Sequence, residues 1–457
     1  MRMSVIVKFN INLIFFFLKK TMTLRLATNG TNEKGIMPDI ALKNEVSLSG
    51  VLANNYGYCN ATPLGPYQGT RNTKIIIDVP QEMIDLKQSY LEFQIAGSAG
   101  NTAGIVCSFV PDIRSIISRM TILFGSKTIL DVIGYGLLQN ILNYTNDPQW
   151  YNFGGNVLVA SDSSQTNRQA YFTSTNKVYA CKLGFAEGIE SLFQKIIPFN
   201  KVGSTMQIQI WLDDPQNVIS TSIAPTGTVN PSYVVNQVEF HYVSYYPSPE
   251  LNAMYDSKIS NNNFITFTYR SFDYQLDTSS VQAGLTSVSK FLTYKYTNFL
   301  GLILAFQPQA LPGTWTADNK MNYFFNPGVN VLRLKVGSQY YPQENYTSDS
   351  DVYGRFLLTF GISPEFPIQA AANWNYNGST PASASYIATT PVMKYPDSIK
   401  SDERMEVCGL DTSIATSLQL DLGFSAAVPS GGLQLLMWCY YGVTISINKN
   451  GSVTLNT

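Results

Sequence analysis

Apolar and polar residues alternate along several short segments of this chain, and this period of two is the feature that most constrains its fold. Between Met206 and Leu212, the apolar residues occupy every second position. Because successive side chains of a β-strand point to opposite faces, such a segment packs one face on a core and exposes the other. The same alternation occurs in Leu91 to Ile95, Leu332 to Val336 and Leu418 to Leu422. These segments predict an all-β protein with half-buried antiparallel strands.

The C-terminal end of the chain predicts a β-hairpin. Two strand-like segments, Val443 to Ile447 and Ser452 to Leu455, flank the dipeptide Asn450-Gly451. Asn-Gly readily adopts the positive φ angles that a tight hairpin turn requires. We therefore expect these two segments to pair with each other.

Helical patterns are few and short. The first is an apolar stripe that stops at Pro198 and consists of Ile189, Leu192, Phe193, Ile196 and Ile197. The second contains two glycines and consists of Ile133, Leu137, Leu138, Ile141 and Leu142. A third helix is predicted to begin with Ser248 as N-cap and Pro249 at the first helical position, and to run to about Ile259. The run Asn261-Asn262-Asn263 ends it.

The length of the chain and two internal echoes predict a duplication. At 457 residues, the chain exceeds the roughly 250 to 300 residues at which a single core stops growing. Two segments of the first half have a similar counterpart in the second half, and we call each such pair an echo. In the first echo, the segment around Gly125-Ser126 resembles the one around Gly337-Ser338. In the second, the segment His241–Tyr246 resembles the segment Cys439–Val443. Their similar offsets favour a duplicated unit of roughly 200 residues. We expect an arm at 1–45, a first unit at 46–247, a helical linker at 248–263 and a second unit at 264–457.

The charge content favours contact between proteins over binding to nucleic acid. Charged residues make up 13% of the chain, about half of the roughly 25% of a typical soluble domain. Thirty basic residues against 31 acidic ones give a net charge of -1, so no global field attracts a polyanion. The visible basic cluster is N-terminal and consists of Lys8, Lys19, Lys20 and Arg25. No direct sequence-specific binding of nucleic acid is expected.

Three interpretations of residues 1–21 stay open. Arg2 and Lys8 precede an apolar run from Leu13 to Leu18, which is too short to span a bilayer. The segment is an arm that faces a membrane or a partner, a signal peptide without a clear cleavage site, or the product of a start placed upstream of a true start at Met22.

The five cysteines point to a reducing compartment. Cys59, Cys107, Cys181, Cys408 and Cys439 are scattered, odd in number and never in a C-x-x-C spacing. This pattern argues against a disulfide framework and against a zinc ribbon. Buried free thiols are expected. The six N-x-[ST] sequons at Asn29, Asn60, Asn143, Asn345, Asn377 and Asn450 have meaning only in a secreted protein.

Residues with catalytic chemistry are sparse. His241 is the only histidine, which excludes a His-rich metal site, and its strand-like surroundings favour a structural role. The S-x-x-K match at Ser287 to Lys290 lacks its companion motifs. The densest carboxylates, Asp213-Asp214 and Glu403 with Glu406, lie beside turn signals, where solvated acids are the expected state. We therefore predict no catalytic, cofactor-binding or metal site, and no enzyme.

Three segments resemble one family, the double jelly-roll major capsid proteins of the adenovirus, virophage and polinton-like lineage. The run from Ser191 to Asn200, followed by Met206 to Pro215, looks like the late part of their first jelly roll. Leu332 to Gln343 is similar to the G-S-x-x-Y-P stretch of the second roll, and Tyr440 to Gly451 resembles the last strand and terminal hairpin. The resemblance as a whole covers residues from about 74 to 455, and the chain has no long tower insertion.

The resemblance implies two tandem eight-stranded jelly rolls with a few short helices. It further implies homotrimeric, pseudo-hexagonal capsomers, which tile an icosahedral shell around double-stranded DNA inside the host cell. Expected partners are copies of the chain, neighbouring capsomers, and minor capsid or penton proteins. The N-terminal arm would face the shell interior, where Leu13 to Lys20 could contact an internal membrane.

Two other functions remain open from the sequence. A secreted carbohydrate-binding or carbohydrate-cleaving β-sandwich would use the 28 tyrosines and 5 tryptophans as sugar-stacking platforms. A single jelly-roll capsid protein with long loops would lack both the duplication and the helical connector near Pro249 to Ile259.

Overall fold

Strands make up most of what the computed structural model describes. The described residues are 51–110, 112–143, 165–172, 177–185, 189, 191–201, 203, 205–262, 264–275, 280–293, 295–311, 314–317, 320–321, 323–342, 345, 348–360, 386–392, 409–413, 417–448 and 452–456. Val51–Thr457 is one compact unit. The predicted arm at 1–45 lies outside the described residues.

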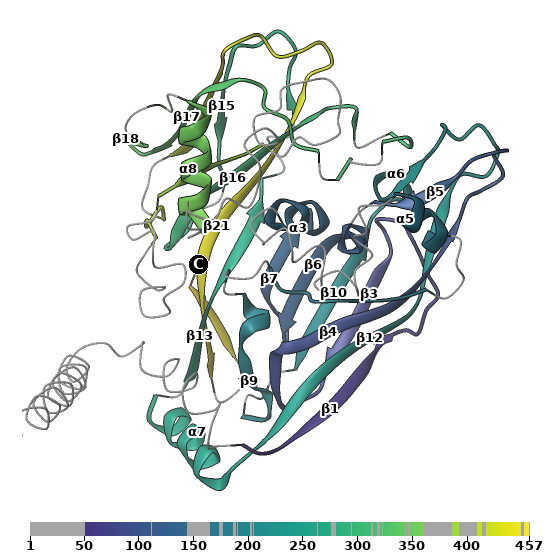
Figure 1. Cartoon of the computed structure of the whole chain (residues 1–457). Coiled ribbons are helices and arrows are strands. Elements are labelled where there is room, and N and C mark those ends of the chain that lie inside the picture. Colours follow the sequence, from purple (N-terminus) through teal and green to yellow (C-terminus); the bar gives the residue numbers. More distant parts are fainter. Residues whose placement is uncertain are drawn as a thin grey trace, which may run out of the picture. The chain divides into compact units, whose positions relative to one another are not determined.

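Two four-stranded layers form the first half (Figure 1). One layer has the order β1-β12-β4-β8, with bounds Val51–Thr62, Ser232–Pro247, Met83–Ser98 and Lys177–Cys181. The other has the order β3-β10-β6-β7, with bounds Lys74–Val79, Met206–Leu212, Ile117–Phe124 and Lys127–Ile133. The end of β1 joins the layers, because Ala61 and Thr62 pair with β3. Four short strands complete this half: β2 (Tyr67–Gln68) pairs with β12, β9 (Ile196–Pro198) with β4, and β5 (Cys107–Phe109) with β11 (Ile219–Thr221).

The second half contains two layers of the same kind. One has the order β13-β21-β16-β19, with bounds Phe264–Tyr274, Leu433–Asn448, Phe299–Pro308 and Ile387–Pro391. The other has the order β15-β20-β17-β18, with bounds Ser287–Phe291, Leu418–Phe424, Val329–Val336 and Gln339–Tyr341. Two further strands, β14 (Ser280–Val281) and β22 (Val453–Asn456), pair with β21.

The strand order is identical in the two halves. When the eight principal strands of each half are counted along the chain, both halves pair them as 1-8-3-6 and 2-7-4-5. Two antiparallel layers of four strands are the architecture of a jelly roll. The predicted tandem of eight-stranded jelly rolls is therefore confirmed, while the boundaries at 46–247 and 264–457 stay predictions.

The first sequence echo falls on equivalent turns. Gly125 joins β6 to β7 and Gly337 joins β17 to β18, with φ angles of 56° and 62°. The Gly125 amide donates to the carbonyl of Thr205 at 2.9 Å, and the Gly337 amide donates to that of Ser417 at 2.9 Å. Both acceptors directly precede the seventh strand of their half. Positive φ explains why glycine occupies both turns. The second echo lies on β12 and β21, the eighth principal strand of each half.

Most of the local sequence predictions hold. All four alternating segments are strands, and β10 alternates buried and half-buried residues along its whole length. The terminal hairpin is confirmed by pairing of Ile447 with Val453, although Asn450 and Gly451 lie outside the described residues.

The helix predicted from the apolar stripe at 189–197 is wrong. This segment contains a 3-10 turn, η2 (Leu192–Gln194), followed by β9. Ile197 pairs with Ile84 on β4, and this pairing of β-branched residues overrides the local helical period.

The helices are short and lie in the connections. They are α3 (Tyr135–Asn143), α5 (Gln165–Phe172), α6 (Pro215–Val218), α7 (Pro249–Asn262) and α8 (Asp349–Phe360), with the 3-10 turns η1 (Ile113–Ile116) and η3 (Phe199–Lys201). Two of them were predicted, α3 and α7, and Ser248 caps α7 by accepting from the Leu251 amide at 3.2 Å. None of the described helices is both long and apolar enough to cross a membrane.

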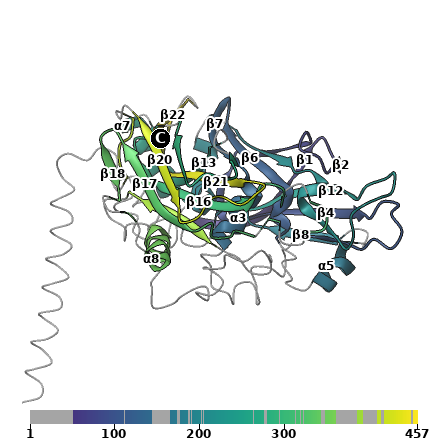
Figure 2. The ribbon, with the colours of Figure 1, turned by 90° about the horizontal axis from the view of Figure 1, so that it is seen from above.

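A mixed apolar and polar seam joins the two jelly rolls where β13 and β21 lie beside β7 and α3. Figure 2 shows these elements side by side from above. The indole N–H of Trp438 on β21 donates to the carbonyl of Ile133 at 3.3 Å, and the Tyr269 hydroxyl donates to that of Ile129. The rings of Phe185 and Phe272 meet edge to face at 4.7 Å. Backbone contacts add to the seam, since the Thr221 amide donates to the Trp315 carbonyl at 2.7 Å. The ammonium of Lys320, almost fully buried, donates to the carbonyl of Ile219.

We expect Gly134→Ala to destabilise the protein more than Gly104→Ala. Both glycines have positive φ, +67° and +71°, which costs a residue with a Cβ about 1–2 kcal/mol. A Cβ at Gly134 would lie 3.3 Å from the ring of the fully buried Trp438, whereas one at Gly104 would meet nothing within 4 Å. The strained contact should add about 1 kcal/mol. Chemical denaturation of both variants measures the difference, and equal losses would contradict the tight seam at Trp438.

Candidate functional site: the outer face of the first sheet

The only histidine lies on the outer face of the β1-β12-β4-β8 sheet. On β12, Phe240 points into the core, while Glu239 and His241 occupy the alternate, half-buried positions. On β4, Leu91 and Phe93 are buried, while Tyr90 and Glu92 alternate with them. Cross-strand register places Glu239 opposite Glu92 and His241 opposite Tyr90. Paired residues of neighbouring strands point to the same face, so the four side chains form one cluster.

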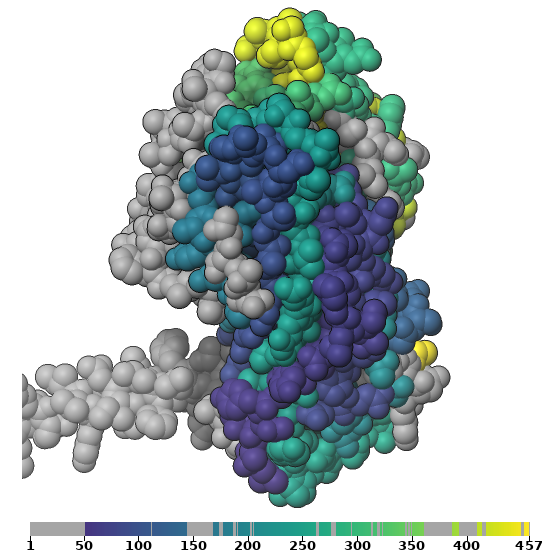
Figure 3. All heavy atoms as spheres, turned by 90° about the vertical axis from the view of Figure 1, so that its right-hand side faces the viewer, coloured from purple at the N-terminus to yellow at the C-terminus, as the bar shows by residue number. Residues whose placement is uncertain are grey.

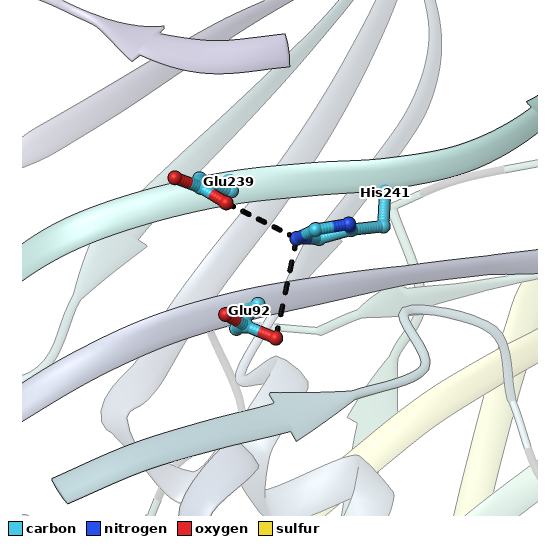
Figure 4. Close-up of side chains that lie close together, drawn as sticks. All are labelled: Glu92, Glu239 and His241. Carbon is cyan, nitrogen blue, oxygen red and sulfur yellow. Dashed lines mark ion pairs between the residues drawn. The ribbon is translucent and has the colours of Figure 1, made fainter. Parts of the chain in front are cut away.

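The cluster has the geometry of an imidazole facing two carboxylates (Figure 4). His241 Nε2 lies 3.2 Å from Glu239 Oε2 and 4.0 Å from Glu92 Oε2. The ring stacks on Tyr90 with centroids 4.7 Å apart and an interplanar angle of 4°. On the other side, the Tyr58 ring lies 5.7 Å from it. These contacts fix the plane of the imidazole, which is 24% exposed.

Exposed tyrosines continue this face onto β1 (Figure 3), where β1 in purple runs beside β12 in teal. Tyr56 and Tyr58 alternate with Gly57, and their side chains are 75% and 59% exposed. Tyr58 lies directly opposite His241 in the register. Between 51 and 60, β1 pairs with β12, and among the described residues no strand pairs with its other edge. An open strand edge bordered by exposed aromatic rings is a typical contact surface.

The S-x-x-K match does not form a site. Ser287 and Lys290 both lie on β15, and a separation of three residues places them on opposite faces of a strand. Lys290 Nζ donates to the carbonyl of Ser280 at 3.3 Å. The neighbouring Ser289 donates its hydroxyl to Asp421 at 2.6 Å. A serine nucleophile activated by this lysine is therefore excluded.

The expectation of solvated acids is wrong for Asp213. Its side chain is only 8% exposed and accepts from Arg71 Nε at 2.9 Å and from Asn217 Nδ2 at 2.8 Å. These contacts connect the end of β10 to the turn before β3, so Asp213 has a structural role. Asp214 is 45% exposed and accepts from the Arg71 amide at 3.1 Å. Glu403 and Glu406 lie outside the described residues.

A buried ion pair in the first roll escaped the sequence predictions. The Arg114 guanidinium forms a bidentate pair with Asp112, with Nη2 2.7 Å from Oδ2. Its Nη1 donates to Gln139 Oε1 at 3.1 Å, and Nη2 also donates to Asn143 Oδ1 at 2.8 Å. Asn143 is almost fully buried, so this sequon cannot accept a glycan, whereas Asn60 on β1 is exposed. Local sequence carries no signal for these contacts, because Arg114 and α3 meet only in the folded chain.

The thiols of the described part of the chain are free, as predicted, but only three of the four are buried, since Cys59 is half-buried. Cys59, Cys107, Cys181 and Cys439 form no disulfide. Burial raises the pKa of the Cys181 thiol to about 12. Because the thiolate is the reactive form, this thiol is a poor nucleophile at neutral pH. Cys408 lies outside the described residues.

Known structures share the arrangement of the described strands. The Faustovirus major capsid protein has a TM-score of 0.54 at 11% sequence identity, over 96% of this chain and 98% of that chain. The capsid of the virus PBCV-1 gives 0.56 at 10%, over 89% and 97%. The Sputnik virophage gives 0.52 at 12%, over 90% and 89%. No family model matches the sequence, and no curated protein matches it significantly.

The fold is a double jelly roll. The fold prediction made from three short segments is confirmed. In this double jelly roll, the His241 cluster and the exposed tyrosines lie on β1, β4 and β12 of the first roll, whereas the seam residues Trp438 and Tyr269 bind to β7 of its other layer.

We expect Arg114→Met to destabilise the double jelly roll far more than Arg119→Met. Removing Arg114 leaves Asp112 charged and buried, which typically costs about 3–5 kcal/mol. Arg119 also forms a bidentate pair, with Asp131, but the two side chains are 40% and 33% exposed. An exposed pair contributes about 1 kcal/mol or less. Denaturant titration compares the two variants, and losses of equal size would show that the buried pair is not structural.

Ionisation of Asp273 should make the free energy of unfolding of the protein depend on pH. Burial raises its pKa to about 6, against about 3.9 in an unfolded chain. The native state therefore favours the neutral form, whose stabilising contribution is complete below about pH 4 and is lost as the pH rises through about 6. Asp273→Asn keeps an acceptor for the Tyr296 hydroxyl, which lies 2.9 Å away.

This variant should be more stable than the wild type at pH 8, by about 2 kcal/mol, and about equally stable at pH 4. Urea unfolding at the two pH values tests the difference. A variant that is less stable at pH 8 would contradict the burial of an ionised Asp273.

Proposed function

We propose that this chain is the major capsid protein of an icosahedral double-stranded DNA virus and assembles as a homotrimer. The observation that carries the proposal is the repeated strand order, 1-8-3-6 and 2-7-4-5, in both halves of one chain. Three such chains present six similar sandwiches around a threefold axis. That arrangement gives a trimer a nearly hexagonal outline, which can tile a shell in a way that three single sandwiches cannot.

The duplication also favours this role over the alternatives. A carbohydrate-binding or carbohydrate-cleaving sandwich would use exposed tyrosines, but it has no need of a second roll with the same strand order. A single jelly roll with long loops does not contain eight further strands. In our proposal α7 is the linker between two structural units, the chain has no enzymatic activity, and its location is the virion.

The composition of the whole chain and the exposed edge of the first roll both support self-association. Only 13% of all residues are charged, and sparse charge suits large obligate interfaces. Tyr56 and Tyr58 add exposed aromatic surface beside an open strand edge. We propose a second copy of the chain as the partner of this surface. Minor capsid or penton proteins are further proposed partners, and the arm at 1–45 is proposed to face the interior, against an internal membrane where one exists.

The purified chain should be a trimer at micromolar concentration. Multi-angle light scattering should give roughly three times the 50.7 kDa of the monomer, because an obligate interface leaves no stable separate subunit. A folded species of 50.7 kDa would contradict the proposal. Circular dichroism of the same sample distinguishes a folded monomer from an unfolded chain.

The double variant Tyr56→Glu/Tyr58→Glu should weaken the trimer. Two carboxylates in an apolar contact lose their hydration on association, so we expect the dissociation constant to rise at least tenfold. Phe291→Glu is the matched control, because Phe291 is 68% exposed and lies on β15 of the second roll. Sedimentation velocity over a dilution series compares them. A double variant that dissociates no more readily than the wild type would exclude β1 as an interface.

A further inference from the structure

We propose that Glu92, Glu239 and His241 form a binding site for a divalent transition-metal ion, with zinc as the best-suited probe. The three side chains project from two adjacent strands of the first roll, and one donor atom from each lies within 4.8 Å of the others. The proposal depends on this face alone and is independent of the capsid role.

The spacing of the donors fits one ion. With separations of 3.2 and 4.0 Å from His241 Nε2 to the two carboxylates, and at most 4.8 Å within the group, a central ion would lie roughly 2.0–2.4 Å from each donor, close to Zn–N and Zn–O bond lengths. An imidazole with two carboxylates is a ligand set that suits first-row divalent ions. Three protein ligands leave further coordination positions for water.

The two negative charges of the cluster also favour a bound cation. Glu92 and Glu239 are direct cross-strand partners, and like charges at such positions destabilise a sheet. Among the described residues, neither carboxylate forms an ion pair with a lysine or arginine; His241 is the partner of both. A divalent ion between them would relieve this repulsion.

The imidazole is held in place by stacking, and its Nε2 atom neither accepts nor donates a hydrogen bond. Nε2 is buried and makes no hydrogen bond, although Glu239 Oε2 lies only 3.2 Å away. A nitrogen and an oxygen that lie this close without a hydrogen bond are the arrangement expected for two ligands of one ion. Stacking on Tyr90 at 4.7 Å fixes the ring, so little side-chain freedom is lost when an ion binds. The Glu92 side chain, 36% exposed, leaves access from solvent.

The experiment uses the full chain, stripped with a chelator and titrated with zinc against a chromophoric competitor. The comparison is between the wild type and Glu92→Gln/Glu239→Gln, whose side chains keep the same shape. We expect the wild type to bind one more zinc equivalent than the double variant, or to bind zinc at least 100-fold more tightly. Equal binding by the two proteins would overturn the proposal and leave the cluster as an ion pair only.

Two controls separate this site from other sources of zinc binding. Tyr90→Phe keeps the stacked ring and all three ligands, and should bind zinc as the wild type does. Cobalt should give a visible spectrum without a thiolate charge-transfer band, because no cysteine belongs to the site; such a band, lost in the double variant, would contradict the ligand set. Calcium is the comparison ion, because imidazole is a poor ligand for hard cations. Tighter binding of calcium than of zinc would also overturn the proposal.

Discussion

The eighth principal strand of each half, β12 or β21, holds its jelly roll together. β12 and β21 are each 16 residues long, and each pairs with one long strand on either edge over most of its length. Because an unpaired backbone group in a core is costly, these strands fix the register of the strands beside them. The register of β12 decides which residues reach the outer face, and β21 carries Trp438 to the seam.

The parts of the fold that sequence predicts are those in which one face is buried. Alternation identified β10 and β20 because water contacts one side of each. It could not identify β16, which is almost fully buried and has no period of two. The helix predicted at 189–197 is wrong because the apolar period near 3.6 occurs there by chance. In the folded chain, Ile197 of this segment pairs with Ile84 as a strand residue. The helix α8 was missed altogether.

The outer-face cluster could not be predicted, for a different reason. Glu92 and His241 are far apart in the chain and meet only through the register of β4 with β12. His241 was correctly placed in a strand, but a strand assignment does not tell which residue lies opposite. The same limit applies to Arg114 with Asn143 and to Asp213 with Arg71. The equivalent turns at Gly125 and Gly337, in contrast, left a visible echo because positive φ selects glycine locally.

The duplication gives the fold its proposed use, since two rolls with one strand order let three chains present six similar sides. The most direct test is electron microscopy of the purified protein with averaging of single particles. The account predicts a threefold particle with a nearly hexagonal outline and six lobes, each the size of one jelly roll. Particles with two lobes, or assemblies with a symmetry other than threefold, would contradict it.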